Sequence, residues 1–367
     1  MAKQKEKKQT PVSRLMEYAG SFQYLAVASW VLAAVSAFVA LVPFYFIWRL
    51  IKEVLRVAPD YGAAQNLSTY GWSAVGFAIL SMLIYIGALI CSHLAAFRVQ
   101  ANMRSRLMRH ILSLPIGFMD SGLGGISVLK AAVQIMPNED FIYYGDSKHA
   151  PYGTKTLEEV RALTIEHITY LIKEKHAKAV AVACNTATSA AVRILRDMYP
   201  DLPLVGVEPA IKPAVLATGH AKVVVMATPM TLREEKFHKL ESLYDEQADI
   251  YPLPCPGLME FVEQGILSGE KLETFLHNLL DPYKDKDITG IVLGCTHYPF
   301  LKETIQKIAG PSVTIFDGGY GTAKELLRRL RVADLAQVDN MRKGSVTFLN
   351  SSDDPALIQR SKKLLNS

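Results

Sequence analysis

Two kinds of hydrophobic pattern divide the chain near residue 115. In the first part, residues 22–48 carry no charged side chain, and residues 71–97 carry only the titratable His93. About 20 apolar residues span the hydrocarbon core of a bilayer, so each run predicts a transmembrane helix. A secretory signal peptide has a shorter apolar core of about 7–15 residues followed by a small-residue cleavage site, and this region shows no such arrangement.

From residue 116 onward, short apolar runs alternate with amphipathic stretches. The runs predict strands at 116–119, 141–144, 179–183, 204–207, 223–226, 291–293 and 313–316. The amphipathic stretches predict helices at 126–135, 157–173, 187–198, 232–245, 269–279, 301–308 and 322–330. Strands that alternate with helices form parallel sheets, so we expect an α/β fold for this part of the chain.

Basic residues flank the apolar runs unevenly. The N-terminal flank and the flank after the second run carry Lys3, Lys5, Lys7, Lys8, Arg14, Arg98, Arg104, Arg106 and Arg109, and the loop between the runs carries Arg49, Lys52 and Arg56. Since Lys and Arg are enriched on the cytoplasmic side, both ends are predicted to be cytoplasmic, with the α/β part tethered to the inner face of the cell membrane. The net charge of +5 is mild and much of the excess lies in the first 14 residues, so nucleic-acid binding is not expected.

The four cysteines are Cys91, Cys184, Cys255 and Cys295. They give no disulfide framework, and a reduced cytosolic compartment fits them best. Cys91 lies within an apolar run and is predicted to be inert. Cys255 lies between two prolines without an acid, base or amide neighbour, so we expect a structural role for it.

The other two cysteines each follow a predicted strand. Cys184 lies in Ala-Cys-Asn-Thr-Ala-Thr and Cys295 in Gly-Cys-Thr-His-Tyr-Pro. A lone cysteine is more often a buried small hydrophobe, but the following Asn185 and Thr186 offer amide and hydroxyl groups to a carboxylate. Active sites collect at strand ends in α/β proteins. Two thiols facing one pocket could remove a proton from one face of a small molecule and return one to the other, which is racemisation without a cofactor.

Other polar groups also follow predicted strands. Asp120 and Ser121 begin a Gly-rich turn before a helix, and such a turn suits an anion or, with the carboxylate, an amine. A nucleotide site competes with this interpretation, but the Gly-x-Gly-x-x-Gly fingerprint is absent. Glu208 follows the fourth strand, and His297 could relay the proton of Cys295 or be a turn residue without a role.

The remaining candidates are weaker. The segment with Tyr152 and Gly153 has the chemistry of an ordinary turn, although its backbone could line a polar pocket. The spacing of the histidines with cysteine or with one another does not suit a metal site, so no metal is expected; these histidines are His149, His167, His220 and His238.

Residues 115–367 resemble a complete glutamate racemase. The matching motifs are Ile-Gly-Phe-Met-Asp-Ser-Gly-Leu-Gly-Gly, Tyr-Gly-Asp with Pro-Tyr-Gly, the two cysteine motifs and Val-Glu-Pro-Ala. In combination these motifs are highly specific for the family, and the resemblance covers about two thirds of the chain. The resemblance implies two pseudo-symmetric parallel-sheet α/β domains with the site between them, one from 116–208 plus 318–367 and the other from 209–317.

The resemblance also implies roles for residues. Cys184 would deprotonate D-glutamate and Cys295 would deprotonate L-glutamate, assisted by Asp120 and His297 respectively, with Glu208 as a supporting carboxylate. The positions that match substrate contacts are Asp120, Ser121, Tyr152, Gly153, Asn185, Thr186, Thr296 and His297. No cofactor is needed, a homodimer is expected, and the D-glutamate would supply peptidoglycan synthesis.

Residues 1–115 resemble the start of the membrane domain of an ABC exporter. The resembling features are the basic leader, Val42-Pro43-Phe44 at the end of the first helix, and the segment 93–98 that runs into 104–107. No Gly-x-x-x-x-Gly-Lys-Ser/Thr phosphate loop occurs in the chain, so the resemblance does not imply transport. The seam at 114–120 suits both families, which favours a fusion of a truncated exporter segment to the enzyme.

Three alternatives stay open from the sequence. Aspartate racemase also uses two cysteines, but its second motif usually has Glu instead of His after Cys-Thr. The chain could instead be a transporter fragment or membrane adaptor that carries the α/β part as a passenger. The helices could also act only as a tether for an active racemase.

Overall fold

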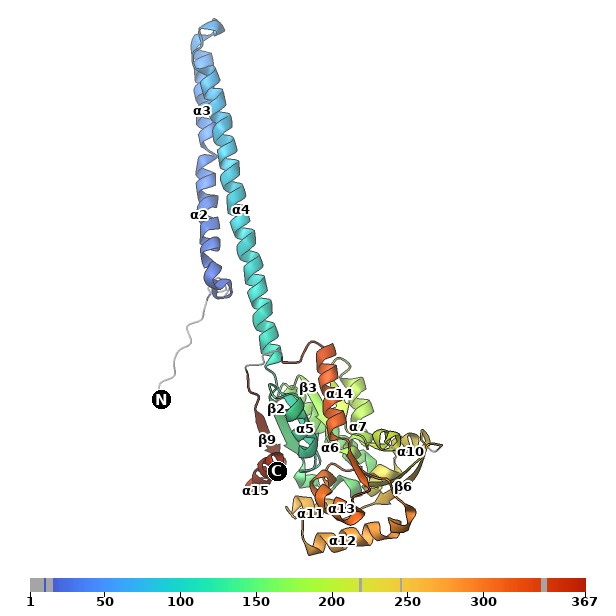
Figure 1. Cartoon of the computed structure of the whole chain (residues 1–367). Coiled ribbons are helices and arrows are strands. Elements are labelled where there is room, and N and C mark those ends of the chain that lie inside the picture. Colours follow the sequence, from blue (N-terminus) through green and yellow to red (C-terminus); the bar gives the residue numbers. More distant parts are fainter. Residues whose placement is uncertain (1–9, 11–15, 218–219, 245, 338–341) are drawn as a thin grey trace, which may run out of the picture. The chain divides into compact units, whose positions relative to one another are not determined.

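The computed structural model describes residues 10, 16–217, 220–244, 246–337 and 342–367. The chain divides into two compact units, Met1–His110 and Ile111–Ser367, which Figure 1 shows in blue to cyan and in green to red. The basic residues of the N-terminal leader, Lys3, Lys5, Lys7, Lys8 and Arg14, lie outside the described residues.

The first unit is built from long apolar helices. Helices α2 (Gln23–Val39) and α3 (Val42–Val57) lie alongside α4 (Leu67–Leu112), with 3-10 turns at Gly20–Phe22 and Tyr61–Ala63. The first predicted span is therefore two helices, because Pro43 lacks an N–H and is tolerated only in the first turn of α3. The second is longer than predicted: 46 residues extend about 69 Å, against a hydrocarbon core of about 30 Å.

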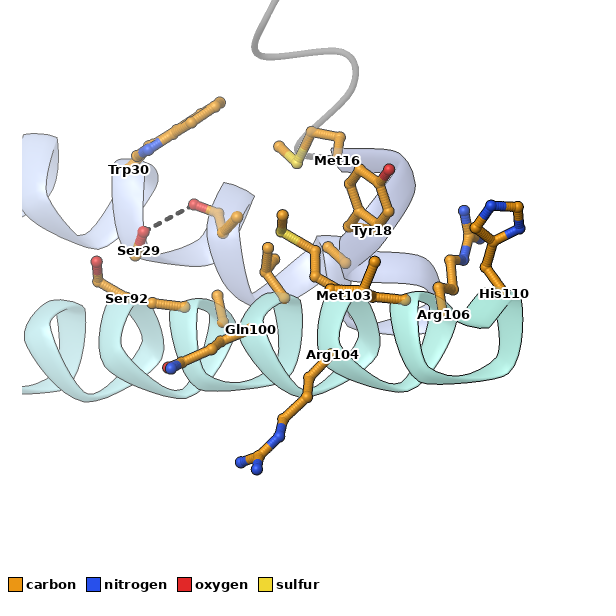
Figure 2. A pocket seen from close by; sticks show the side chains of 16 residues that line it. Met16, Tyr18, Ser29, Trp30, Ser92, Gln100, Met103, Arg104, Arg106 and His110 are labelled. Carbon is orange, nitrogen blue, oxygen red and sulfur yellow. Dashed lines mark hydrogen bonds between the residues drawn. The ribbon is translucent and has the colours of Figure 1, made fainter. Parts of the chain in front are cut away.

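The helices of this unit contact each other through small and aromatic side chains. Ser36 Oγ donates a hydrogen bond to the Ser81 carbonyl at 3.0 Å, and the Phe46 and Phe77 rings stack at 5.7 Å. Between α2 and α4 lies a cavity of about 990 Å³ with mostly apolar walls. Figure 2 shows Met16, Trp30 and Met103 along this cavity. Residues 16–57 and 67–112 are long and apolar enough to cross a membrane.

The second unit contains two parallel sheets. The first has the strand order β4-β3-β1-β2-β9, from Leu204–Gly206, Ala179–Val182, Ile116–Asp120, Phe141–Gly145 and Val346–Asn350. The second has the order β6-β5-β7-β8, from Ala248–Pro254, Ala221–Ala227, Gly290–Leu293 and Thr314–Asp317. Every described pairing is parallel, which confirms the predicted architecture of two parallel-sheet α/β domains.

Helices cover both faces of the first sheet. On one face α5 (Ile126–Ile135), α14 (Gly319–Val332) and α15 (Pro355–Asn366) pack against Ile116 and Phe118. On the other face α6 (Leu157–Lys173) and α7 (Asn185–Met198) pack against Met119, Val180 and Val182. Successive side chains of a strand point to opposite faces, so these largely apolar strands supply both layers of the core.

The second sheet is covered in the same way. On one face are α11 (Leu258–Glu263), α12 (Glu270–Leu280) and α13 (Lys302–Ala309); on the other are α8 (Ile211–Leu216), α9 (Pro229–Arg233) and α10 (Glu235–Ser242). Short 3-10 turns complete the unit at Ser147–His149, Tyr152–Thr154, Asp281–Lys286 and Tyr298–Leu301.

Some elements differ from the sequence prediction. The strands β6 and β9 were not predicted, because both lie in stretches with exposed and half-buried side chains and lack a strongly apolar run. The helix predicted at 232–245 is two short helices that meet at Glu234, whose extended backbone interrupts the helical pattern. The end of that prediction, Asp245, lies outside the described residues.

One buried ion pair gives a stability prediction. Lys178 Nζ lies 2.6 Å from Glu139 Oε2 and also donates to the Leu112 carbonyl at 2.6 Å, and both side chains are almost fully buried. Removing one partner leaves a buried charge uncompensated, so Glu139→Ala should destabilise the chain by about 3–5 kcal/mol. Urea unfolding, followed by circular dichroism, checks this expectation. A loss as small as that of Glu325→Ala, which breaks a surface pair, would contradict it.

Candidate active site

The two motif cysteines lie at the carboxyl ends of central strands. Cys184 follows β3 and caps the N-terminus of α7, where its Sγ accepts a hydrogen bond from the Ala187 amide at 3.5 Å. Cys295 follows β7, and both thiols line one small cavity. The structure therefore brings the two cysteines to one pocket, as the sequence predicted.

Most of the other candidate residues line the same cavity. Besides the two cysteines, its walls include Ser121, Tyr152, Gly153, Asn185, Thr186, Thr296 and His297. Residues that we did not predict, Thr228, Met259 and Gly294, complete it. The enclosed space measures about 10 Å³, room for about one water molecule, so the walls must move apart before an amino acid can enter.

Asp120 lies beneath this cavity and is fully buried. Its Oδ1 accepts from the Gly122 amide at 2.8 Å, and its Oδ2 accepts from the Thr296 hydroxyl at 3.1 Å. Burial raises the pKa of the Asp120 carboxyl, and the charge of His297 offsets part of that effect. Asp120 thus joins the turn after β1 to the loop after β7.

The surroundings of the two thiols differ. Burial and the nearby Asp120 carboxylate raise the pKa of Cys184 to about 12, so this group is a thiol at neutral pH. Ser121 Oγ lies 3.6 Å from the Cys184 sulfur. Cys295 Sγ instead lies 3.6 Å from His297 Nδ1, an imidazole that can take or hold a proton. One thiol has an acidic neighbour and the other a basic one.

Glu263 is a polar residue of this site that the sequence analysis missed. Its Oε1 lies 2.7 Å from His297 Nε2 and accepts from the Leu123 amide at 2.7 Å. Burial lowers the pKa of His297, but the hydrogen bonds and charges of Cys295 and Glu263 outweigh it and raise that pKa well above its ordinary value. Glu263 is the last residue of α11 and does not follow a strand in the sequence. The sequence therefore gave no signal that identified it as a site residue.

Glu208 lies elsewhere. Its side chain is exposed and lines a separate cavity of about 180 Å³ together with Thr188, Ser189 and Lys239. Asn185 lines both cavities. Glu208 is thus not among the residues that line the cysteine cavity, and the carboxylate beside the His297 imidazole is Glu263.

Two groups of polar atoms remain available to a ligand. The hydroxyls of Thr186, Thr228 and Thr231 lie 2.9–3.3 Å from one another. Asn185 Oδ1 is buried, and no described residue makes a hydrogen bond with it. Buried polar atoms normally have partners, so this amide suits a group of the substrate. Thr228 follows β5, and its place at a strand end is the signal that could have identified it.

Comparisons with known proteins agree with this geometry. Residues 116–326 match the model of the Asp/Glu/Hydantoin racemase family. The chain is 53% identical over 251 residues to the glutamate racemase of Clostridium perfringens, covering 68% of this chain and 96% of that protein. It is 52% identical over 253 residues to the glutamate racemase of Clostridium botulinum, covering 69% and 97%.

Solved structures give the same result. Glutamate racemase RacE1 of Bacillus anthracis has a TM-score of 0.63 at 30% identity and covers 69% of this chain and 94% of its own. The Francisella tularensis enzyme in complex with D-glutamate has a TM-score of 0.61 at 29% identity and covers 70% and 95%. The chain is an amino-acid racemase that belongs to the glutamate racemase family.

Proposed function

We propose that the chain interconverts L- and D-glutamate without a cofactor, with Cys184 and Cys295 as the two acid/base groups. The observation that carries this proposal is that both thiols line one cavity, each with a different polar neighbour. In this scheme one group removes the α-proton as a thiolate while the other, as a thiol, delivers a proton to the opposite face. Substrate bound between the thiols, with its carboxylate at the threonine hydroxyls, meets that requirement.

The surroundings of the two thiols support a different role for each. Burial raises the pKa of Cys184, which favours its thiol form, and Cys295 lies 3.6 Å from the His297 imidazole. In this scheme Cys295 takes the α-proton of L-glutamate and Cys184 delivers a proton. The reverse assignment holds for D-glutamate. Tyr152 and Gly153 would line the substrate, and Asp120 would orient Thr296 and assist Cys184.

The proton transfer itself is demanding. The α-proton of an amino acid is far less acidic than a thiol, whose ordinary pKa is about 8.5. The site must therefore desolvate the thiolate and stabilise the developing negative charge with fixed dipoles. The N-terminus of α7 at Cys184 and the hydroxyls around the cavity are the dipoles that this chain supplies.

Proton exchange in heavy water tests this function. The purified full chain, given L-glutamate and no added cofactor, should incorporate deuterium at the α-carbon and form D-glutamate. A parallel reaction with aspartate tests whether the chain acts on this related amino acid instead. If the folded chain exchanges aspartate and leaves glutamate untouched, the assigned substrate is wrong; if it exchanges neither, the racemase function itself is wrong.

We further propose that α2, α3 and α4 hold the enzyme at the inner face of the cell membrane and that its product serves peptidoglycan synthesis. Support for the membrane comes from large apolar side chains that are more than half exposed along these helices, among them Phe38, Trp72 and Phe97. The homodimer, the division of the enzyme into domains at residues 208 and 317, and the exporter origin of residues 1–115 stay predictions.

Deleting residues 1–110 should leave glutamate racemisation unchanged. Among the described residues, none before 111 belongs to the four hydrophobic cores of the second unit. Leu112, whose carbonyl accepts a hydrogen bond from Lys178, is kept. Kinetic assays of the truncated and full chains, both in the same detergent, make the comparison. Loss of activity in a truncated chain with native circular dichroism would contradict the independence of the enzyme unit.

A further inference from the structure

A cluster of one carboxylate and two imidazoles lies next to the wall of the cysteine cavity. Asp146 follows β2, His149 ends the next 3-10 turn, and His167 comes from the middle of α6. One ligand atom from each lies within 4.8 Å of the others. His149 Nδ1 is 2.8 Å from Asp146 Oδ1, and His167 Nε2 is 3.0 Å from Asp146 Oδ2.

Two of the three side chains are buried and the third is partly exposed to solvent. Asp146 is fully buried and His167 is 6% exposed, so two of the groups are held away from water. The His149 side chain is 37% exposed, which leaves a path from solvent to the cluster. His167 Nε2 is fully buried, and it lies 3.0 Å from the Asp146 carboxylate. The two imidazoles therefore approach the same carboxylate, one from the solvent side and one from the core.

We propose that Asp146, His149 and His167 form a binding site for a divalent transition-metal ion of the zinc type. Two imidazole nitrogens and one carboxylate oxygen are a donor set that zinc, cobalt and nickel accept, with water in the fourth position. Around a tetrahedral zinc at ~2.0–2.2 Å from each ligand, donor atoms lie about 3.3–3.5 Å apart. The separations of 2.8 and 3.0 Å run to different oxygens of Asp146, and one ligand atom from each residue lies within 4.8 Å of the others, so side-chain rotations would bring the three ligands around one ion.

The site lies close to the proposed catalytic cavity. The Tyr152 hydroxyl donates to Asp146 Oδ2 at 2.7 Å, and Tyr152 also lines the cavity of the cysteines. A metal ion on this carboxylate would compete with the tyrosine for the same oxygen. The metal site itself rests on the three ligands and is independent of which amino acid the enzyme racemises.

The simpler alternative is a hydrogen-bonded hub without a metal. Burial raises the pKa of the Asp146 carboxyl, but hydrogen bonds from His167, Ser351, Tyr152 and His149 outweigh it and hold that pKa below its ordinary value. In that case the histidines serve only to anchor the loop between β2 and α6. The two interpretations differ in whether the cluster binds an ion with defined stoichiometry.

Cobalt absorption and calorimetry separate them. Because thiols also bind these metals, the measurements use the full chain with Cys184→Ser and Cys295→Ser, purified without a His tag and freed of metal. Titration with Co²⁺ should give visible d–d bands that saturate at one ion per chain, and Zn²⁺ should displace it. Both His149→Gln and His167→Gln in the same background should lose this saturable binding. His149→Gln is the milder change because His149 is partly exposed.

The matched control is His277→Gln. His277 Nδ1 lies 3.1 Å from Asp281 Oδ1 at the surface, so this pair has one imidazole and one carboxylate but is not among the clusters of three metal-binding groups found in the described residues. Unchanged Co²⁺ binding in this variant, with loss in the other two, supports the site. Binding that survives both His149→Gln and His167→Gln, or a folded parent chain that takes up no ion, overturns the proposal.

Discussion

Cys184→Ala and Cys295→Ala should each reduce glutamate racemisation by about 10²- to 10⁴-fold, the usual contribution of a positioned acid or base. Each variant removes the proton donor or acceptor on one face of the substrate. Because L- and D-glutamate are mirror images with an equilibrium constant of one, kcat/KM must fall equally in both directions. Circular dichroism assays started from either enantiomer measure this.

Hydrogen exchange distinguishes the two variants from each other. Cys184→Ala keeps Cys295, the group assigned to L-glutamate. In this variant the rate of exchange of the L-glutamate α-proton with heavy water should therefore fall less than the rate of racemisation. Cys295→Ala should show the opposite preference for D-glutamate. The same preference in both variants would contradict the assignment of one thiol to each face.

Cys255→Ala is the matched control for these variants. Cys255 is also buried, but its Sγ donates to the Leu253 carbonyl at 3.3 Å and its side chain belongs to the core of the second sheet. It does not line the cysteine cavity. Racemisation should therefore remain close to that of the parent chain. A loss as large as that of Cys184→Ala would mean that the effect comes from packing.

Glu263→Gln should reduce kcat/KM by about 10- to 100-fold. The carboxylate accepts a charge-assisted hydrogen bond from His297, and such bonds contribute roughly 1.5–3 kcal/mol, or about one to two decades in rate. Glutamine keeps the size of the side chain and removes its charge. Steady-state rates with L- and D-glutamate across the pH range provide the measurement.

The pH dependence tests whether Glu263 acts through His297. Glu263 helps to hold the pKa of His297 above its ordinary value, whereas burial acts in the opposite direction. Without the carboxylate charge the pKa of the imidazole falls, so protonated His297 is lost at a lower pH. The alkaline limb of the kcat/KM profile should then move to lower pH in Glu263→Gln.

Glu325→Gln serves as the control for the charge change. Glu325 is also hydrogen-bonded to basic side chains, Arg328 and Arg329, but at the surface and on α14. Its substitution should leave the pH profile as it is. A parent-like profile in Glu263→Gln would show that Glu263 has a merely structural role in holding the Leu123 amide.

Local patterns in the sequence predicted most of the enzyme unit. The apolar runs at 116–119, 141–144 and 179–183 became the central strands β1, β2 and β3, because a strand buried on both faces must be apolar throughout. The capping box of Thr156 and Glu159 explains why α6 begins where predicted. The long charge-free runs likewise predicted the apolar helices of the first unit.

The sequence by itself also determined which polar residues lie at the ends of strands. It therefore identified the cysteines, Asp120 and Thr296 as site candidates, since parallel strands carry their ligand-binding loops at one edge. Only the tertiary structure decided that Glu263 contacts His297, and that Asp146, His149 and His167 form one cluster. These contacts join residues from separate helices and loops. Their distances depend on how elements pack, and no local periodicity or spacing along the chain encodes that packing.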